Sequence, residues 1–224
     1  IDALGCLGGD GTYICALSLT KMGINCVGVP CTIDNDVAGT DYTIGFDTAL
    51  TTIVEAVDKL RDTSSSHRRC SIIEVMGRNC GALAIHAGIA VGAEIVITSE
   101  TGYDPEELIE TICNAAKTKR HAIVIVAEKV TSIFDMADLI SKKTPFSARA
   151  SILGHIQRGG CPTPRDRVLA SCMGVKAVEE LVKGNGGVCI CERNNTLEAI
   201  PFETALTMKK DQVSEKMKSF KELW

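Results

Sequence analysis

The sequence predicts an α/β fold in which mostly parallel sheets are flanked by helices. Short apolar runs alternate along the chain with stretches whose apolar residues recur at helical spacing. The run from Ala122 to Ala127 is uninterrupted and rich in β-branched residues, as expected of a strand that is covered on both faces. Strands and helices in alternation are typical of parallel sheets with helices on both sides.

Each predicted strand is a short apolar run that is bounded by glycine or polar residues. These strands lie at residues 3–7, 26–30, 71–75, 94–98, 122–127, 148–154 and 188–191. Helices are predicted from about residue 12, over 49–60 and 82–91, from 105, and over 166–183. The best-defined helix start has Asp104 as N-cap, Pro105 in the first helical position and Glu107 three residues after the cap.

Composition narrows the class of protein. The 224 residues are 45% hydrophobic and 23% charged, the usual proportions of a globular protein with a substantial core. The net charge is −4 and no basic stripe is interleaved with aromatic residues, which argues against a nucleic-acid partner. The longest apolar run, at 122–127, is too short to span a membrane. The 11 cysteines form no C-x-x-C pair, so we expect buried reduced thiols and a cytoplasmic location, with metal ligation and disulfides as alternatives.

The first residues have the pattern of the interior of a strand. The chain starts at Ile1 rather than Met, and its start has neither the basic flank nor the cleavage site of a signal peptide. We therefore expect the sequence to be truncated at its N-terminal end.

Polar clusters follow several of the predicted strands. In parallel α/β folds, ligands bind beyond the carboxyl ends of the strands. We therefore expect the functional residues among five groups at these ends: Gly8–Gly11, Thr32–Asp36, Met76–Arg78, Glu128 and His155–Arg158.

The first cluster is a glycine-aspartate turn between a strand and a helix. Gly9 and Gly11 allow a phosphate to approach the backbone, and the helix N-terminus favours anions. Asp10 is a candidate Mg²⁺ ligand, directly or through water. A tight turn with a capping aspartate explains the same residues. Neither G-x-x-x-x-G-K-[ST] nor G-x-G-x-x-G occurs, which disfavours P-loop and dinucleotide-binding folds.

The second cluster places two carboxylates, Asp34 and Asp36, two residues apart in a loop. A kinase needs one carboxylate to orient and deprotonate the acceptor hydroxyl, and others near Mg²⁺. An Asx-rich turn is the alternative.

The remaining clusters contain cations that suit phosphate groups. Arg78 follows Gly77 at a strand end and suits a transferring phosphoryl group, although a surface arginine is the commoner outcome. His155 and Arg158 suit a sugar phosphate, with a structural histidine as the alternative.

Together these clusters resemble the ATP-dependent 6-phosphofructokinases of bacterial type along the whole chain. The segments that carry the resemblance are 1–4, 8–11, 30, 32–36, 39–46, 61–67, 74–78 and 154–160. The glycine-aspartate turn is shared with NAD kinases and lipid kinases, whereas the loops at 32–36 and 154–160 are far more specific.

The resemblance implies a two-lobed phosphofructokinase-like fold. One lobe, residues 1–45 plus 157–207, would bind nucleotide, and the other, 46–156 plus 208–224, would bind sugar phosphate. The implied reaction is the glycolytic transfer of the γ-phosphoryl group of MgATP to the 1-hydroxyl of fructose 6-phosphate. The implied assembly is a homotetramer with an allosteric nucleotide site between subunits. Because a glycine-rich phosphate loop of the family precedes Ile1, we expect this chain alone to be inactive.

Roles follow from the resemblance at matching positions. Asp34 resembles the base, Thr32 and Asp36 line its site, and Arg78 resembles the stabiliser of the transferred group. Asp10 matches the Mg²⁺ residue, and Gly9 and Gly11 match nucleotide contacts. The implied sugar-phosphate contacts are Met76, Gly77, Glu128, His155 and Arg158, with Arg69 and Arg149 reaching from a neighbouring subunit. The effector positions are Arg61, Glu94, Lys119 and His121, although Lys119 and His121 also suit a solvated helix end.

Cys31 departs from the family pattern, which has glycine next to the Asp34 loop. Pyrophosphate-dependent relatives carry aspartate at position 11 and lysine at position 31, so Gly11 and Cys31 favour ATP as the donor. A pyrophosphate-dependent enzyme and a non-catalytic sugar-phosphate sensor stay open as alternatives, as does an NAD or lipid kinase.

Overall fold

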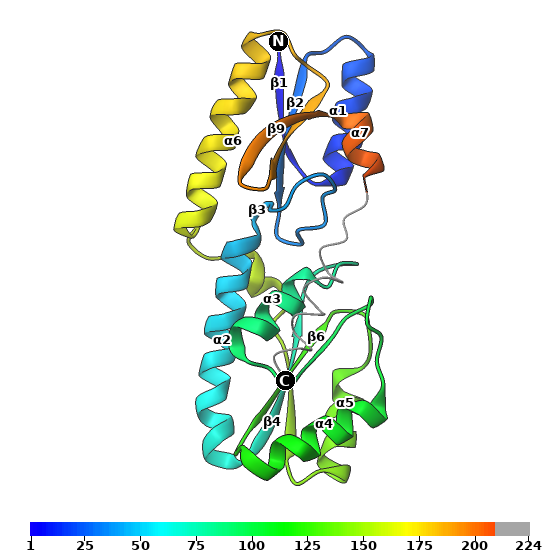
Figure 1. Cartoon of the computed structure of the whole chain (residues 1–224), viewed down its shortest axis with the longest axis vertical. Coiled ribbons are helices and arrows are strands. Elements are labelled where there is room, and N and C mark those ends of the chain that lie inside the picture. The colour runs from blue at the N-terminus through cyan, green and yellow to red at the C-terminus, as the bar shows by residue number, and fades with distance from the viewer. Residues whose placement is uncertain (209–224) are drawn as a thin grey trace. The chain divides into compact units, whose positions relative to one another are not determined.

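The computed structural model describes residues 1–208 and divides them into two compact units (Figure 1). Among the described residues, unit one is Ile1–Thr48 and residues 161–208, and unit two is Ala49–Gly160. The lobes implied by the resemblance divide the chain at nearby positions. Of residues 208–224, which that prediction gives to the second lobe, only Met208 lies among the described residues.

Unit one is built on a sheet with the strand order β1-β2-β8-β9. Strands β1 (Leu4–Gly8), β2 (Cys26–Thr32) and β8 (Val188–Arg193) are parallel, and β9 (Thr196–Pro201) pairs with β8 in antiparallel fashion. A two-residue strand, β3 (Ile44–Gly45), pairs with the end of β2.

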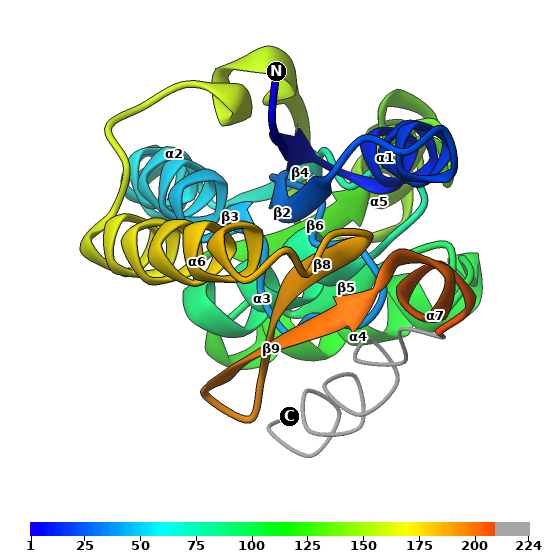
Figure 2. The ribbon, with the colours of Figure 1, turned by 90° about the horizontal axis from the view of Figure 1, so that it is seen from above.

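Helices cover both faces of the unit-one sheet (Figure 2). On one face, α1 (Asp10–Lys21) and α7 (Phe202–Thr207) pack Tyr13 and Phe202 against the cysteines of β2 and β8. A Cβ at Gly28 would lie 2.6 Å from the Phe202 ring and 2.8 Å from the Tyr13 ring, so glycine is required at this position in β2. The other face of the sheet carries α6 (Pro164–Val182), whose buried residues contact Val27 and Val29.

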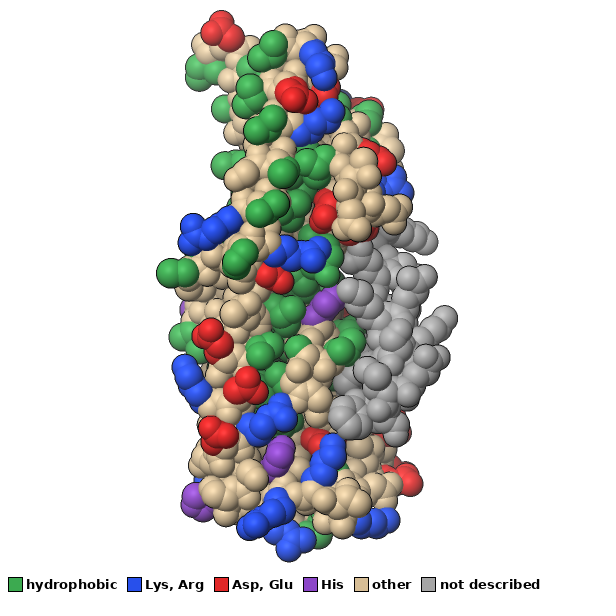
Figure 3. Space-filling model, turned by 60° about the vertical axis from the view of Figure 1, so that its left-hand side comes forward, with side chains coloured by type: hydrophobic (Ala, Val, Ile, Leu, Met, Phe, Trp, Pro, Cys, Tyr) green, Lys and Arg blue, Asp and Glu red, His purple; other side chains and the backbone are tan. Residues whose placement is uncertain are grey.

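The outer side of α6 also carries exposed apolar side chains. Four valines of this helix are exposed, and hydrophobic side chains are visible on this face of unit one (Figure 3). They are Val168, Val175, Val178 and Val182.

Unit two is built on a fully parallel sheet with the strand order β5-β6-β4-β7. These strands are β4 (Arg69–Val75), β5 (Ile95–Ile97), β6 (Ala122–Ala127) and β7 (Ser147–Ile152). Helices α4 (Pro105–Thr118) and α5 (Ile133–Lys143) bury Leu108, Ile112, Met136 and Ile140 against one face of this sheet. Helix α3 (Ala82–Val91) contacts β5 and β6, and α2 (Phe46–His67) leads into β4.

The predicted α/β fold with mostly parallel sheets is confirmed, and so are the helix at 82–91, the strand at 122–127 and the cap at Asp104. The strand predicted at 148–154 is too long, because Gly154 has a φ of +56° and begins a 3₁₀ helix, η1 (Gly154–Arg158). That short helix also corrects the expectation of a loop at 154–160. The β8–β9 hairpin and helix α5 were not predicted. Within residues 1–208, no helix is both long and apolar enough to cross a bilayer.

The cysteines are free thiols with mixed exposure. The buried ones fit the prediction of small hydrophobic groups, and they are Cys6, Cys26, Cys70, Cys189 and Cys191. The prediction is wrong for the exposed ones, which are Cys15, Cys31, Cys161 and Cys172.

The C-terminal end of α6 is held by a buried carboxylate, Glu180. Its Oε2 accepts a hydrogen bond from Asn185 Nδ2 at 2.9 Å, and its Oε1 lies 3.2 Å from Lys176 Nζ and 3.3 Å from Lys183 Nζ. The Asn185 hydrogen bond, followed by those from the two lysines, lowers the pKa of Glu180 to about 2.

This low pKa predicts a specific dependence of stability on pH. A carboxyl whose pKa is lower in the folded state stabilises the fold above its unfolded pKa of about 4.3, and this contribution is lost as the pH falls through its folded value. We therefore expect Glu180→Gln to be less stable than the parent by a constant margin above about pH 5, and the margin to close toward pH 2. Urea unfolding between pH 7 and pH 3 measures it, with the exposed Glu179→Gln as control. A margin that does not change with pH would contradict the prediction.

Candidate functional site

In unit one, the glycine-aspartate turn and the Asp34 loop (residues 32–43) leave the same edge of the sheet. Strands β1 and β2 are parallel, with Gly8 opposite Pro30, so the segments that follow them both leave the sheet at its carboxyl edge. A Cβ at Gly9 would lie 3.8 Å from Val37 and 4.0 Å from Thr32, which shows how closely the two segments approach. The predicted juxtaposition of these two clusters is therefore present.

The glycine-aspartate turn is open to ligand. Gly9 is the N-cap of α1, no side chain caps this helix, and Asp10 is exposed in its first turn. A Cβ at Gly11 would have no neighbour within 4 Å, so packing within the protein does not require glycine there. Backbone N–H groups at a helix N-terminus are a favourable environment for phosphate.

The Asp34 loop places one carboxylate in a buried position and the next one partly exposed. Asp34 is 8% exposed, and its backbone N–H donates to Thr32 Oγ1 at 3.3 Å. Asp36, two residues on, is half-buried. Asn35 between them is buried and has a φ of +50°, in the left-handed region that asparagine tolerates. The Asp34 loop therefore has a defined backbone conformation at Asn35.

Cys31 lies at the base of the Asp34 loop, in β2, and its side chain is exposed. Although the residue is exposed overall, partial desolvation of its thiol, and then the charge of Asp166, raise the pKa of Cys31. Position 31 therefore carries a neutral thiol near pH 7, and not a cation.

In unit two, the turn Met76–Arg78 follows β4 and is fixed by two side chains. Gln157 Oε1 accepts from the Met76 N–H at 3.0 Å, and Glu128 Oε1 accepts from the Arg78 N–H at 2.7 Å. Gly77 has a φ of +150°, and a Cβ there would lie 2.4 Å from the carbonyl oxygen of Cys80. The turn presents Arg78, with a φ of +59°, as an exposed side chain.

Helix η1 brings the fifth cluster to the same edge of the unit-two sheet. Gln157 is buried, whereas His155 and Arg158 on the same short helix are exposed. Since β4, β6 and β7 are parallel and in register, Met76, Glu128 and His155 all follow the carboxyl ends of neighbouring strands. Burial, and then the charge of Glu128, raise the pKa of Glu74 at the end of β4. The edge therefore combines exposed cations with a carboxyl pair.

Arg69 and Arg149 are not part of this edge. Arg69 is the first residue of β4, and a seven-residue strand at roughly 3.3 Å per residue places it about 20 Å from the carboxyl end. Arg149 lies in the edge strand β7, where its Nη1 donates to the carbonyl oxygen of Ala148 at 2.8 Å. Arg69 is therefore not positioned to join His155 within one chain.

Two of the four predicted effector residues line a groove of unit two. Glu94 and Lys119 form an ion pair of 2.8 Å and line a groove of about 790 Å³ beside β5 and α4. Arg61 donates to the carbonyl oxygen of Val91, and His121 is half-buried just before β6.

The described residues contain no preformed cluster of metal ligands. Among the described residues, no group of three or more His, Cys, Asp or Glu side chains converges as metal ligands. Mg²⁺ often uses only one or two carboxylates together with substrate phosphates. An exposed Asp10 beside an open glycine turn fits that kind of site.

Comparison with known proteins defines the family. The phosphofructokinase family model matches residues 1–181. The chain belongs to the phosphofructokinase family.

Phosphofructokinases with curated names are similar to this chain over most of its length. "ATP-dependent 6-phosphofructokinase" of Tolumonas auensis is 56% identical over 198 residues, which are 88% of this chain and 62% of that protein. The protein of the same name from Buchnera aphidicola is 53% identical over 94% of this chain and 68% of its own length. The chain thus spans roughly two thirds of the length of these relatives.

Solved phosphofructokinase structures share the fold. The Saccharomyces cerevisiae phosphofructokinase superposes with a TM-score of 0.88 at 29% identity, over 98% of this chain and 37% of that chain. A pyrophosphate-dependent phosphofructokinase from Marinobacter aquaeolei gives a TM-score of 0.83 at 20% identity, over 94% and 61% of the two chains. The second likeness shows the fold alone.

Three side chains that organise the candidate site were not predicted. Gln157 fixes the Met76 turn, Asn35 fixes the Asp34 loop, and Asp166 fixes the segment after that loop. Gln157 and Asn35 stand inside motifs that were recognised, which is the one signal that pointed to them.

Proposed function

We propose that the protein transfers the γ-phosphoryl group of MgATP to the 1-hydroxyl of fructose 6-phosphate, giving fructose 1,6-bisphosphate and ADP. The observation that carries the proposal is the approach of the glycine-aspartate turn to the Asp34 loop at one sheet edge. An open, anion-favouring turn beside a buried carboxylate suits a phosphate donor and a hydroxyl acceptor. The names of the relatives at 53–56% identity agree with this chemistry.

The residues of unit one act on the donor and the acceptor hydroxyl. Asp34 accepts the proton of the 1-hydroxyl, and Thr32 and Asp36 line its surroundings. Gly9 and Gly11 leave room for nucleotide phosphates at the start of α1. Asp10 would hold Mg²⁺, which neutralises charge on the phosphates when it is bound.

The residues of unit two bind the sugar phosphate and stabilise developing charge. Arg78 provides a permanent positive charge for the transferred group. Met76, Gly77, Glu128 and Arg158 contact the sugar, and His155 the 6-phosphate. Catalysis of this kind is mostly positioning and electrostatic stabilisation.

In a homotetramer, Arg69 and Arg149 bind the 6-phosphate of the fructose 6-phosphate that is held by a neighbouring subunit. The position of Arg69 at the opposite end of β4 from the carboxyl edge supports this assignment. Arg61, Glu94, Lys119 and His121 form an effector site on the same grounds of resemblance, and the groove lined by Glu94 and Lys119 supports it.

A donor assay on the complete natural protein tests the proposal. We expect ADP to form with ATP only when fructose 6-phosphate is present, and faster than phosphate transfer from pyrophosphate. Faster turnover with pyrophosphate would favour the pyrophosphate-dependent alternative, and binding of fructose 6-phosphate without ADP release would favour a non-catalytic sensor.

Gly11→Asp tests why ATP is the donor. A carboxylate at this position would repel the nucleotide phosphates, so kcat/KM for ATP should fall by at least about tenfold. The fold should be unaffected, because a Cβ at Gly11 meets nothing within 4 Å and an acidic residue suits the first turn of a helix. Steady-state kinetics and thermal unfolding measure the two effects, with Gly11→Ala as the uncharged control. Unchanged ATP kinetics in Gly11→Asp would remove Gly11 from the nucleotide site.

A further inference from the structure

We infer that Asn35 is a positioning residue that sets the place of the Asp34 carboxylate, an assignment that rests on the proposed function. The Asn35 side chain connects the two ends of the Asp34 loop by hydrogen bonds, and the β8–β9 hairpin connects that loop to the sheet.

The amide of Asn35 uses both of its ends. Its Oδ1 accepts from the Thr43 N–H at 2.9 Å and lies 3.2 Å from Thr43 Oγ1, while its Nδ2 donates to the carbonyl oxygen of Asp41 at 3.1 Å. Asn35 is 1% exposed and Thr43 is fully buried, so these bonds are shielded from water. One side chain therefore closes the turn from residue 35 to residue 43.

Thr43 also reaches the residue on the other side of Asp34. Its Oγ1 donates to the carbonyl oxygen of Thr32 at 2.7 Å. Thr32 and Asn35 flank the Ile33–Asp34 segment, and both are bonded to the same threonine. The backbone that carries Asp34 is held from both ends.

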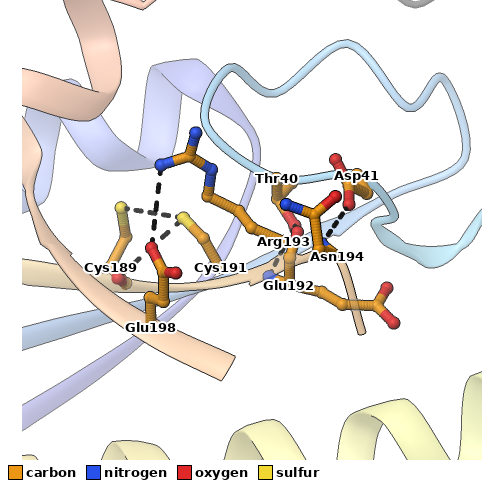
Figure 4. Close-up of polar contacts among 8 residues, drawn as sticks. All are labelled: Thr40, Asp41, Cys189, Cys191, Glu192, Arg193, Asn194 and Glu198. Carbon is orange, nitrogen blue, oxygen red and sulfur yellow. Dashed lines mark hydrogen bonds and ion pairs between the residues drawn. The ribbon is translucent and has the colours of Figure 1, made fainter. Parts of the chain in front are cut away.

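The β8–β9 hairpin anchors the far side of the loop (Figure 4). The Asp41 N–H donates to the carbonyl oxygen of Glu192 at 2.7 Å, and Asp41 Oδ2 accepts from the Asn194 N–H at 2.8 Å. The Glu192 N–H donates to Thr40 Oγ1 at 3.0 Å. The antiparallel β8–β9 hairpin thus supports Thr40 and Asp41, and Asn35 is hydrogen-bonded to the second of these residues.

Asparagine suits position 35 for two independent reasons. Its φ of +50° is strained for most side chains but tolerated by glycine and asparagine. Its amide offers an acceptor and a donor together, which Thr43 and Asp41 require. Glycine would tolerate the positive φ but offers no hydrogen bond from its side chain. Of the two hydrogen-bonding roles of the amide, aspartate would keep only that of the acceptor.

The test removes the amide without adding backbone strain. We expect Asn35→Gly to lower kcat by about 10–100-fold, because a misplacement of roughly 1 Å at a reacting group costs about 10²-fold. In the Asp34→Asn background the same change should lower kcat by less than about threefold, since a residue that acts through Asp34 has nothing left to position. Asn195→Gly is the matched control, because Asn195 is exposed and also has a positive φ, +61°.

Equal losses in both backgrounds, or a normal kcat in Asn35→Gly, would overturn the inference. If Asn35→Gly does not fold, as judged by circular dichroism, Asn35→Asp replaces it, because it keeps the acceptor and the shape and exchanges the donor to Asp41 for a negatively charged oxygen. The same comparison of backgrounds then applies.

Hydrogen exchange at the Thr43 amide separates this inference from the proposed function. We expect that amide to exchange faster in Asn35→Gly than in the parent, whatever the substrate. Suppose that the parent protein has no kinase activity and that the Thr43 amide still exchanges faster in Asn35→Gly. That result would refute the proposed function and leave the anchoring of the loop by Asn35 in place. If Asn35→Gly has the full kinase activity of the parent and its Thr43 amide exchanges at the parental rate, the role of Asn35 is refuted.

Discussion

Asp34→Asn is expected to lower kcat by about 10²–10⁴-fold, the loss that accompanies removal of a general base. The asparagine side chain has nearly the same shape, and the backbone hydrogen bond from residue 34 to Thr32 Oγ1 does not involve the carboxylate. The KM for ATP should therefore change little. Steady-state and single-turnover kinetics in the complete natural protein measure the effect.

The control for this variant is Asp138→Asn, the same substitution at an exposed position of α5. We expect it to have parental kinetics. If Asp34→Asn turned over at a near-normal rate while the fold was intact, Asp34 would not be the base.

Asp166→Ala is expected to destabilise unit one by about 2–5 kcal/mol, because it leaves two partly buried N–H groups without a partner. Asp166 is 3% exposed, and its Oδ1 accepts from the Gly45 N–H at 3.0 Å. Its Oδ2 accepts from the Thr48 N–H at 2.9 Å and from Thr48 Oγ1 at 2.5 Å. The carboxylate belongs to the first turn of α6 but caps the start of α2.

Urea unfolding followed by circular dichroism measures this loss. Asp166→Asn should lose less than Asp166→Ala, because its amide oxygen still accepts one hydrogen bond. Asp138→Ala, at an exposed aspartate, should change the free energy of unfolding by less than about 0.5 kcal/mol. A loss at Asp166 no larger than that of the control would show that the cap of α2 contributes little.

Sequence patterns located the two edges of the sheets where the candidate residues gather. Alternating apolar runs identified the strands, and polar residues at their ends identified Asp10, Asp34, Arg78 and His155, because both are local features. The hairpin strand β9 and helix α5 were missed.

The supports of the site depend on contacts between distant parts of the chain. Gln157 holds Met76 across 81 residues, Asp166 holds Thr48 across 118, and Thr40 meets Glu192 across 152. A single sequence carries no periodicity or spacing that relates such positions. The positions of the candidate residues at the sheet edges were therefore predictable, whereas the side chains that hold them in place were not.

The insertion of unit two within unit one sets an order of assembly during synthesis. All strands of the unit-two sheet are contiguous between Arg69 and Ile152, so this unit has its whole sheet before β8 is made. At about 5–20 residues per second, Glu192 and Asn194 follow the Asp34 loop by roughly 8–30 s on the ribosome. We therefore expect the Asp34 loop to reach its final conformation later than the unit-two sheet, although it is made earlier.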